Sequence, residues 1–207
     1  MMVACRAPLR PTVGNPSPTP STVDELAAAI AADAERSDRE SDSRTRGELA
    51  DEASRDADAC LARAPQAAAC HYGRALALGL EAKAHPTRAG ELLKSMLESL
   101  SSAESADPTY DQGGPARVRG LVLVRAPGWP LGPGDAEAGL AAARRAATLR
   151  PQYPPNLLAL AEALAKNGNP KDARENYERA RDAARALPPS ADRDAWLRQA
   201  DEALQRK

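Results

Sequence analysis

The architecture of this chain is clearest in residues 151–188, PQYPPNLLALAEALAKNGNPKDARENYERARDAARALP. Small and apolar residues recur there at three- and four-residue steps on both sides of Gly168, a pattern typical of two amphipathic helices joined by a glycine turn. Ala161 and Ala173 would let the two helices approach closely, with Leu164 filling the remaining space. The segment therefore predicts an antiparallel helix pair.

The same unit recurs along the chain. Pro65, Pro108 and Pro151 stand at a constant spacing of 43 residues, each five positions after a small residue. A period of this length is typical of stacked helix pairs. The last unit fits the register of tetratricopeptide-type repeats at Leu160, Ala161, Leu164, Gly168, Ala173, Tyr177 and Ala180. We expect an all-α, right-handed solenoid of antiparallel helix pairs with about nine helices.

Start and stop signals divide the chain into predicted elements. Thr22 and Glu25 form a capping box for a first helix, and the charged run 36–42 predicts a loop after it. Pro115 is suited to begin a fifth helix behind a break at 111–114, and Asp135 to cap the sixth. Other predicted helices span 46–63, 66–84, 87–105 and 191–205, the last of which would cap the open end of the stack.

Composition narrows the function classes. Lys+Arg 28 against Asp+Glu 29 leaves a formal net charge of -1, which does not favour binding to a phosphate backbone. Aromatic residues make up 3%, with no Phe, which suits close packing of helices through small residues. No stretch approaches the roughly 20 apolar residues of a membrane-spanning helix. We predict no nucleic-acid partner and no membrane span.

The sequence carries no recognisable catalytic or metal-binding motif. Gly132-Pro133-Gly134-Asp135 lacks the spacing of phosphate-binding loops and predicts a loop with a helix cap. The histidines are His71 and His85, and Cys70 and His71 would point about 100° apart on a helix, which makes a poor chelate. We predict a protein that is not an enzyme and has no metal site or cofactor.

The N-terminal segment differs from the rest. Met2-Val3-Ala4-Cys5 is similar to the end of a bacterial lipoprotein signal, and the proline-rich residues that follow predict a tether. We therefore predict two regions: residues 1–20, a signal remnant and tether with Cys5 lipidated, and residues 21–207, the repeat domain. The alternative is an unstructured cytoplasmic N-terminus with an incidental cysteine.

Cys60 and Cys70 lie five residues on either side of Pro65. If Pro65 marks the turn between antiparallel helices, the two thiols stand at similar heights on facing helices. A disulfide is then geometrically reasonable, and an oxidising compartment would favour it. The alternative is a pair of small buried residues at a helix contact.

In tetratricopeptide-type repeats the first helix of each pair lines a groove. The register points six side chains into that groove: Arg117, Leu121, Arg125, Leu158, Glu162 and Lys166. Asn156 is a further candidate. For each of these residues the alternative is a solvated side chain that lines the groove without binding a partner. Trp129 would either anchor a partner or fold its loop down onto the stack, and we predict the second.

Several stretches resemble a known family. They are DPTYDQGGPARVRG at 107–120, RAPGWP at 125–130, PQYPPNLLALAE at 151–162, Cys60, and CHY at 70–72. Together they resemble the T component (TatT) family of tripartite ATP-independent periplasmic transporters, over about residues 50–185.

The resemblance implies a periplasmic, lipid-anchored protein that is not an enzyme and oligomerises as a trimer. It would work with a solute-binding protein on a small ligand, with a hydrophobic ligand among the options. Another reading is an adaptor whose groove grips a peptide or subunit of a cell-envelope complex, without a transport role. A third is a cytoplasmic adaptor with free thiols at Cys60 and Cys70.

Overall fold

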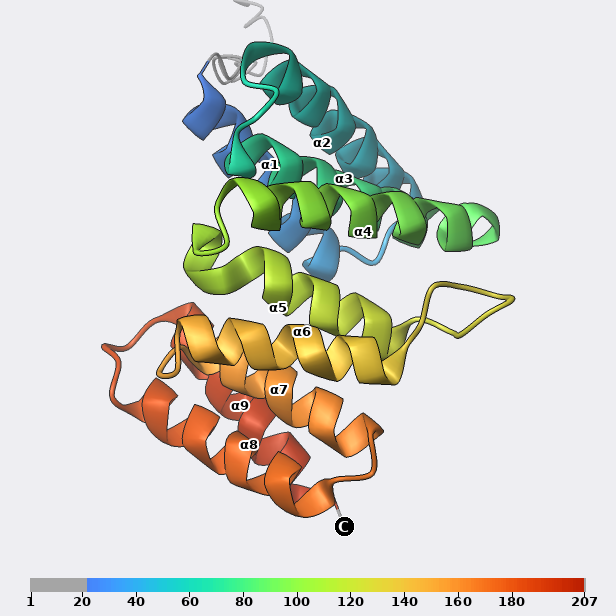
Figure 1. The fold of residues 1–207 in the computed structure, drawn as a ribbon. Helices are drawn as coiled ribbons and strands as arrows, with labels where there is room; N and C mark the ends of the chain where they lie inside the picture. Colours follow the sequence, from blue (N-terminus) through green and yellow to red (C-terminus); the bar gives the residue numbers. More distant parts are fainter. Residues whose placement is uncertain (1–21, 207) are drawn as a thin grey trace, which may run out of the picture.

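The structure is a computed structural model that describes residues 22–206, so Cys5 and the predicted tether lie outside the described residues. The described chain consists of nine α-helices, one short 3-10 helix and their connections (Figure 1). The elements are α1 (Val23–Arg39), α2 (Ser43–Arg63), α3 (Ala68–Ala84), η1 (Pro86–Arg88), α4 (Ala89–Ala106), α5 (Tyr110–Arg125), α6 (Ala136–Leu149), α7 (Pro154–Lys166), α8 (Pro170–Arg185) and α9 (Ala191–Gln205).

The helices stack in chain order as antiparallel pairs (Figure 1). Each helix packs against the next, and α1, α3, α5, α7 and α9 also contact one another in sequence. Within the described residues α2, α4, α6 and α8 make no such contacts with one another. The odd-numbered helices therefore form the inner face of a helical solenoid, and the predicted fold class is confirmed.

The C-terminal pair follows the predicted register. Ala161, Ala173 and Ala180 are buried between α7 and its neighbours, with Leu164 in the same core. Gly168 turns the chain between α7 and α8 with a φ of 74°, a conformation that glycine adopts without the penalty of a side chain. The repeat frame inferred from the sequence thus corresponds to the observed packing.

Close approach between α5 and α6 depends on two glycines. A Cβ atom at Gly139 would lie 2.7 Å from Val124 Cγ2, and one at Gly120 would lie 3.0 Å from the backbone nitrogen of Ala143. A side chain at either position would push these helices apart. Small residues at helix contacts are how a chain with few aromatic residues reaches dense packing.

Two predicted boundaries are wrong at the first connection. The charged run expected to form a loop remains helical to Arg39, where Asp33–Arg36 and Glu35–Arg39 ion pairs span one turn and Ser37 is buried. Helix α2 begins at Ser43, three residues earlier than predicted. Its cap is Asp42, which accepts hydrogen bonds from the backbone and hydroxyl of Thr45 at 2.7 and 2.8 Å.

Other predicted ends are confirmed. Thr22 and Glu25 form the capping box of α1, and Asp135 caps α6 by accepting from the backbone of Ala138 at 2.9 Å. Helix α9 has the predicted bounds. Helices α3 and α4 each start two residues later than predicted, and the short η1 occupies Pro86–Arg88 before α4.

Cys60 and Cys70 form a disulfide between α2 and α3, as predicted, with their Cα atoms 5.2 Å apart. Both residues are fully buried, and they pack against Leu26 of α1. The bridge therefore joins the first two helix pairs beneath the start of α1. None of the helices in the described chain has the length and apolar character needed to cross a membrane.

Candidate ligand-binding groove

A groove runs over α3 on the inner face, between α1 and α5. It consists of two chambers of about 500 Å³ each, and Leu76 lines both. The polar chamber lies over the first half of α3 and includes Tyr72, and the apolar chamber lies over the second half and includes Gly79. Helices α1 and α5 contribute lining to both chambers, so both depend on the relative positions of three inner helices.

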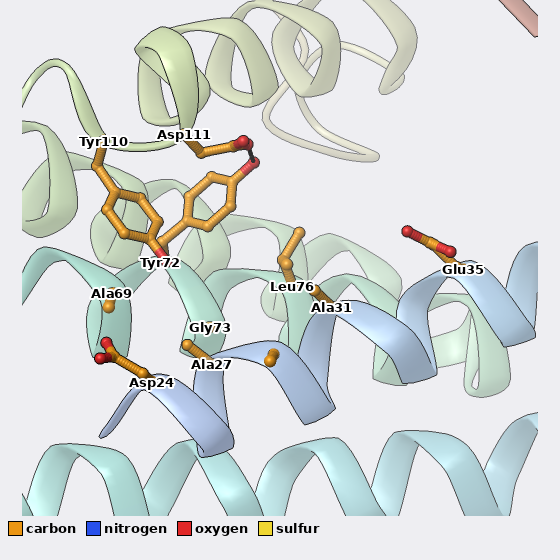
Figure 2. A pocket seen from close by; sticks show the side chains of 11 residues that line it. Asp24, Ala27, Ala31, Glu35, Ala69, Tyr72, Gly73, Leu76, Tyr110 and Asp111 are labelled. Carbon is orange, nitrogen blue, oxygen red and sulfur yellow. Dashed lines mark hydrogen bonds between the residues drawn. The ribbon is translucent and has the colours of Figure 1, made fainter. Parts of the chain in front are cut away.

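Small residues open the polar chamber. Ala27 and Ala31 of α1 and Ala69 and Gly73 of α3 line its lower part, where longer side chains would fill the space (Figure 2). Tyr72 and Tyr110 form its upper wall, with ring centroids 5.4 Å apart and planes at 66°. The chamber is therefore floored by methyl groups and walled by two phenol rings.

Three carboxylates face the polar chamber: Asp24, Glu35 and Asp111. Asp111 accepts a hydrogen bond from the Tyr72 hydroxyl at 2.9 Å (Figure 2). Glu35 lies 3.6 Å from Arg39 in an exposed pair, whereas Asp24 forms no ion pair with any described residue. The charged side chains among the described residues that line the chamber are thus all negative.

Burial raises the pKa of both tyrosines above the usual range. For Tyr72 the desolvation is opposed by the nearby Arg117 guanidinium and reinforced by Asp111. For Tyr110 the carboxylates of Asp111 and Asp24 add to the effect of burial on the pKa. Both phenols therefore keep their protons at neutral pH, and both can donate hydrogen bonds.

An unusual turn positions Asp111. The φ angles are 45° at Asp111, 58° at Gln112 and 83° at Gly113, so three successive residues are left-handed. Such a conformation costs about 1–3 kcal/mol at each residue other than glycine. The break predicted at 111–114 is therefore confirmed, and the regular part of α5 follows it, with Pro115 in its first turn.

Polar side chains from two helices hold this turn. Arg117 donates to the backbone oxygen of Asp111 at 3.1 Å and to its carboxylate at 2.6 Å. Asn156 donates to the backbone oxygens of Gln112 and Ala146, both at 2.9 Å, and accepts from Arg117 at 3.1 Å. These contacts join α5, the end of α6 and α7.

Arg117 and Asn156 are thus not the groove contacts that the sequence suggested. The Asn156 side chain is 0% exposed, and Arg117 retains 11% side-chain exposure behind Asp111. The guanidinium of Arg117 also lies 5.5 Å from the ring of Tyr153, which packs edge-on against Trp196 of α9. Both residues support the groove wall from behind.

The apolar chamber has a different lining. Its lining is mostly aliphatic. Helices α3 and α5 contribute Leu76, Val118, Leu121 and Val122, and α4 contributes Leu93 and Met96. Leu121 and Arg125, two of the predicted groove residues, do lie here. The chamber is open to the inner face and mostly hydrocarbon.

The cations at the rim of the apolar chamber are paired. Arg125 donates to both carboxylate oxygens of Glu162, each at 2.6 Å, and this contact raises the pKa of Arg125. Lys83 pairs with Asp38 across α3 and α1. Glu162, another predicted groove residue, therefore sits beside the chamber as the partner of Arg125.

Two other predicted contacts lie elsewhere. Leu158 is buried against Ala180 and Ala200, because α8 and α9 cover this part of α7, so the expectation that it faces a groove is wrong. Lys166 is exposed at the end of α7 and lines neither chamber.

The expectation that Trp129 folds onto the stack is also wrong. Trp129 is 89% exposed and Leu131 is 77% exposed, on a loop that extends away from the body (Figure 1). Backbone hydrogen bonds close the base of this loop, from Gly134 to Pro127 at 2.9 Å and from Asp135 to Leu123 at 2.9 Å. The loop therefore keeps its shape without burying the indole.

Sequence reasoning missed the first part of the groove. Asp24, Ala31 and Glu35 recur at helical spacing along one face of α1, and Tyr72 and Leu76 do so on α3. Extending the repeat register to the first two units would have placed these residues on the inner face.

No family model matches the chain, and no curated protein was found to be similar. Within the described residues no group of three or more His, Cys, Asp and Glu residues could hold a metal ion.

Proposed function

We propose that this protein is a non-enzymatic binding protein of the bacterial periplasm that holds a small ligand with an apolar part in the groove over α3. The observation that carries the proposal is the apolar chamber of about 500 Å³ on the inner face. Sites for small ligands are concave, mostly apolar and largely preformed, with a few polar groups at fixed places. The chamber fits that description, with two ion pairs at its rim.

A small ligand suits the lining better than a gripped peptide. An extended peptide needs partners for its backbone N–H and C=O groups. The side chains of Leu93, Met96, Val118 and Leu121 offer none, and the rim cations already have carboxylate partners. We therefore favour ligand handling over the peptide-adaptor reading.

Two features support the remainder of the proposal. The Cys60–Cys70 disulfide suits an oxidising compartment, in keeping with an anchor at Cys5. The exposed Trp129 and Leu131 suit contact with a protein partner, which the family resemblance would make a solute-binding subunit. Trimer formation remains part of this proposal.

Binding of a neutral apolar fluorophore, N-phenyl-1-naphthylamine, to the full-length protein tests the chamber. We expect saturable binding that Leu121→Arg abolishes, because the substitution places a charge in the hydrocarbon lining. Leu187→Arg is the matched control, since Leu187 is 39% exposed and lines neither chamber. Equal binding by both variants, or none by the unmodified protein, would overturn the proposal.

A further inference from the structure

We infer that the groove selects positively charged amphiphiles, with an amine or quaternary ammonium head in the polar chamber and a hydrocarbon tail in the apolar chamber. This inference rests on the proposed function of the apolar chamber and adds the charge of its ligand. The carrying observation is that Asp24, Asp111 and two tyrosines line one end of the groove, whereas the lining of the other end is mostly apolar.

The polar chamber presents negative charge to an occupant. Asp24, Glu35 and Asp111 line it, and no Lys or Arg of the described residues does. The cation that pairs with Asp111 is Arg117, which does not line the chamber and has 11% of its side chain exposed. A cationic head would therefore meet carboxylate oxygens first, and an anionic head would be repelled by them.

Nearby cations offset part of the negative charge of the chamber, but its net charge stays negative. Arg117 offsets Asp111, and Arg39 offsets Glu35 in an exposed pair at 3.6 Å. Asp24 has no ion-pair partner in the described chain. Among the described residues the carboxylate of Asp24 thus remains without a counter-ion beside the chamber, and a bound cation would supply one.

The tyrosines add a second kind of attraction. Tyr72 and Tyr110 stand edge to face at the upper wall, and their rings border the same space as the carboxylates (Figure 2). Aromatic faces next to carboxylates attract ammonium groups through the ring quadrupole, and quaternary ammonium heads most distinctively. The methyl groups of Ala27, Ala31 and Ala69 form a floor that leaves room for such a head.

The apolar chamber offers no compensating site for an anion. Its two cations, Lys83 and Arg125, are already paired with Asp38 and Glu162. A carboxylate or phosphate head at that end would meet the carboxylates of Asp38 and Glu162 beside these cations. An anionic amphiphile is therefore disfavoured in either orientation.

One ligand can reach both chambers. They share Leu76, and the rise of about 1.5 Å per residue places Tyr72 and Gly79 about 10 Å apart along α3. A medium-length alkyl chain spans that distance. The head and tail sites can therefore be tested with a single matched series of ligands.

The test measures binding of decyltrimethylammonium, decanoate and decyl maltoside to the full-length protein, each below its critical micelle concentration, by displacement of the neutral fluorophore. We expect the cation to bind at least about ten-fold more tightly than the neutral ligand, and decanoate to bind most weakly. Asp24→Asn should weaken cation binding several-fold more than it weakens binding of the neutral ligand, and Glu35→Gln, about 16 Å from Asp24 along α1, should have a smaller effect on cation binding. Asp51→Asn, on the exposed face of α2, should change neither.

The outcomes separate this inference from the proposed function. Equal affinity for the three ligands, or tighter binding of decanoate, would overturn the charge selection and leave the apolar site intact. Failure of all three to bind would overturn the proposed function. Binding of tetramethylammonium in that case, lost in Asp24→Asn, would still support the head site alone, and its absence would overturn the inference as well.

Discussion

Replacing Asn156 with alanine should destabilise the protein more than the loss of any exposed contact. The carbonyl of Gln112 would lose the Asn156 amide as a donor, and the carbonyl of Ala146 would lose it too but keep the backbone N–H of Arg150 at 3.1 Å. Three hydrogen bonds are lost in all, each worth about 0.5–1.5 kcal/mol. We expect a loss of about 3–5 kcal/mol in the free energy of unfolding, with the vacated volume included.

Asn176→Ala is the matched control. Asn176 is also buried, but its amide donates to Asp172 one turn earlier on α8 and accepts from Arg179 on the same helix. Its loss should cost about 1 kcal/mol, because no bond between helices is broken. Urea unfolding followed by circular dichroism gives both values.

A third substitution separates packing from polarity. Asn156→Asp keeps the shape of the side chain but replaces a donor with an acceptor that faces two carbonyl oxygens. It should destabilise about as much as alanine, despite a stronger contact with Arg117. If Asn156→Ala cost no more than Asn176→Ala, the view that Asn156 ties α5 to α7 would be refuted.

The remaining predictions concern the disulfide, the exposed loop and one buried carboxyl. Reducing the Cys60–Cys70 bridge, which closes a separation of 10 residues, should lower the free energy of unfolding by about 2–3 kcal/mol in a urea titration with reductant; no change would mean that the bridge does not form. Trp129→Ala should change that free energy by less than about 0.5 kcal/mol, and a larger loss would mean that the indole packs. Burial holds the pKa of Asp33 above its ordinary 3.8, so stability linked to this group is present below pH 3.8 and is lost as the pH rises through the folded pKa. The free energy of unfolding of Asp33→Asn, measured relative to that of the unmodified protein, should therefore be higher at pH 7 than at pH 4. A difference that does not change with pH would contradict the assignment.

The sequence predicted the features that depend on local spacing. Periodicity predicts the helix pairs. Residues close in the chain predict the caps at Thr22 and Asp135 and the bridge between Cys60 and Cys70. Local spacing could not show that Leu158 is buried in the core and does not face a groove, because its burial depends on α9 covering α7. The role of Asn156 was equally hidden, since its partners lie 10 to 44 residues away.

The position of the groove follows from an interruption in the inner layer. Along the solenoid the inner helices pack against one another, yet α3 and α5 barely touch, and α4 lines the apolar chamber through the gap with Leu93 and Met96. The left-handed turn at 111–113 lies at the start of α5, where the position of that helix is set. Arg117 and Asn156 fix this turn against α7, so the contacts that stabilise the fold also hold the chamber open. A variant that weakens them should lose fluorophore binding in proportion to the release of the turn, even though neither side chain reaches the ligand.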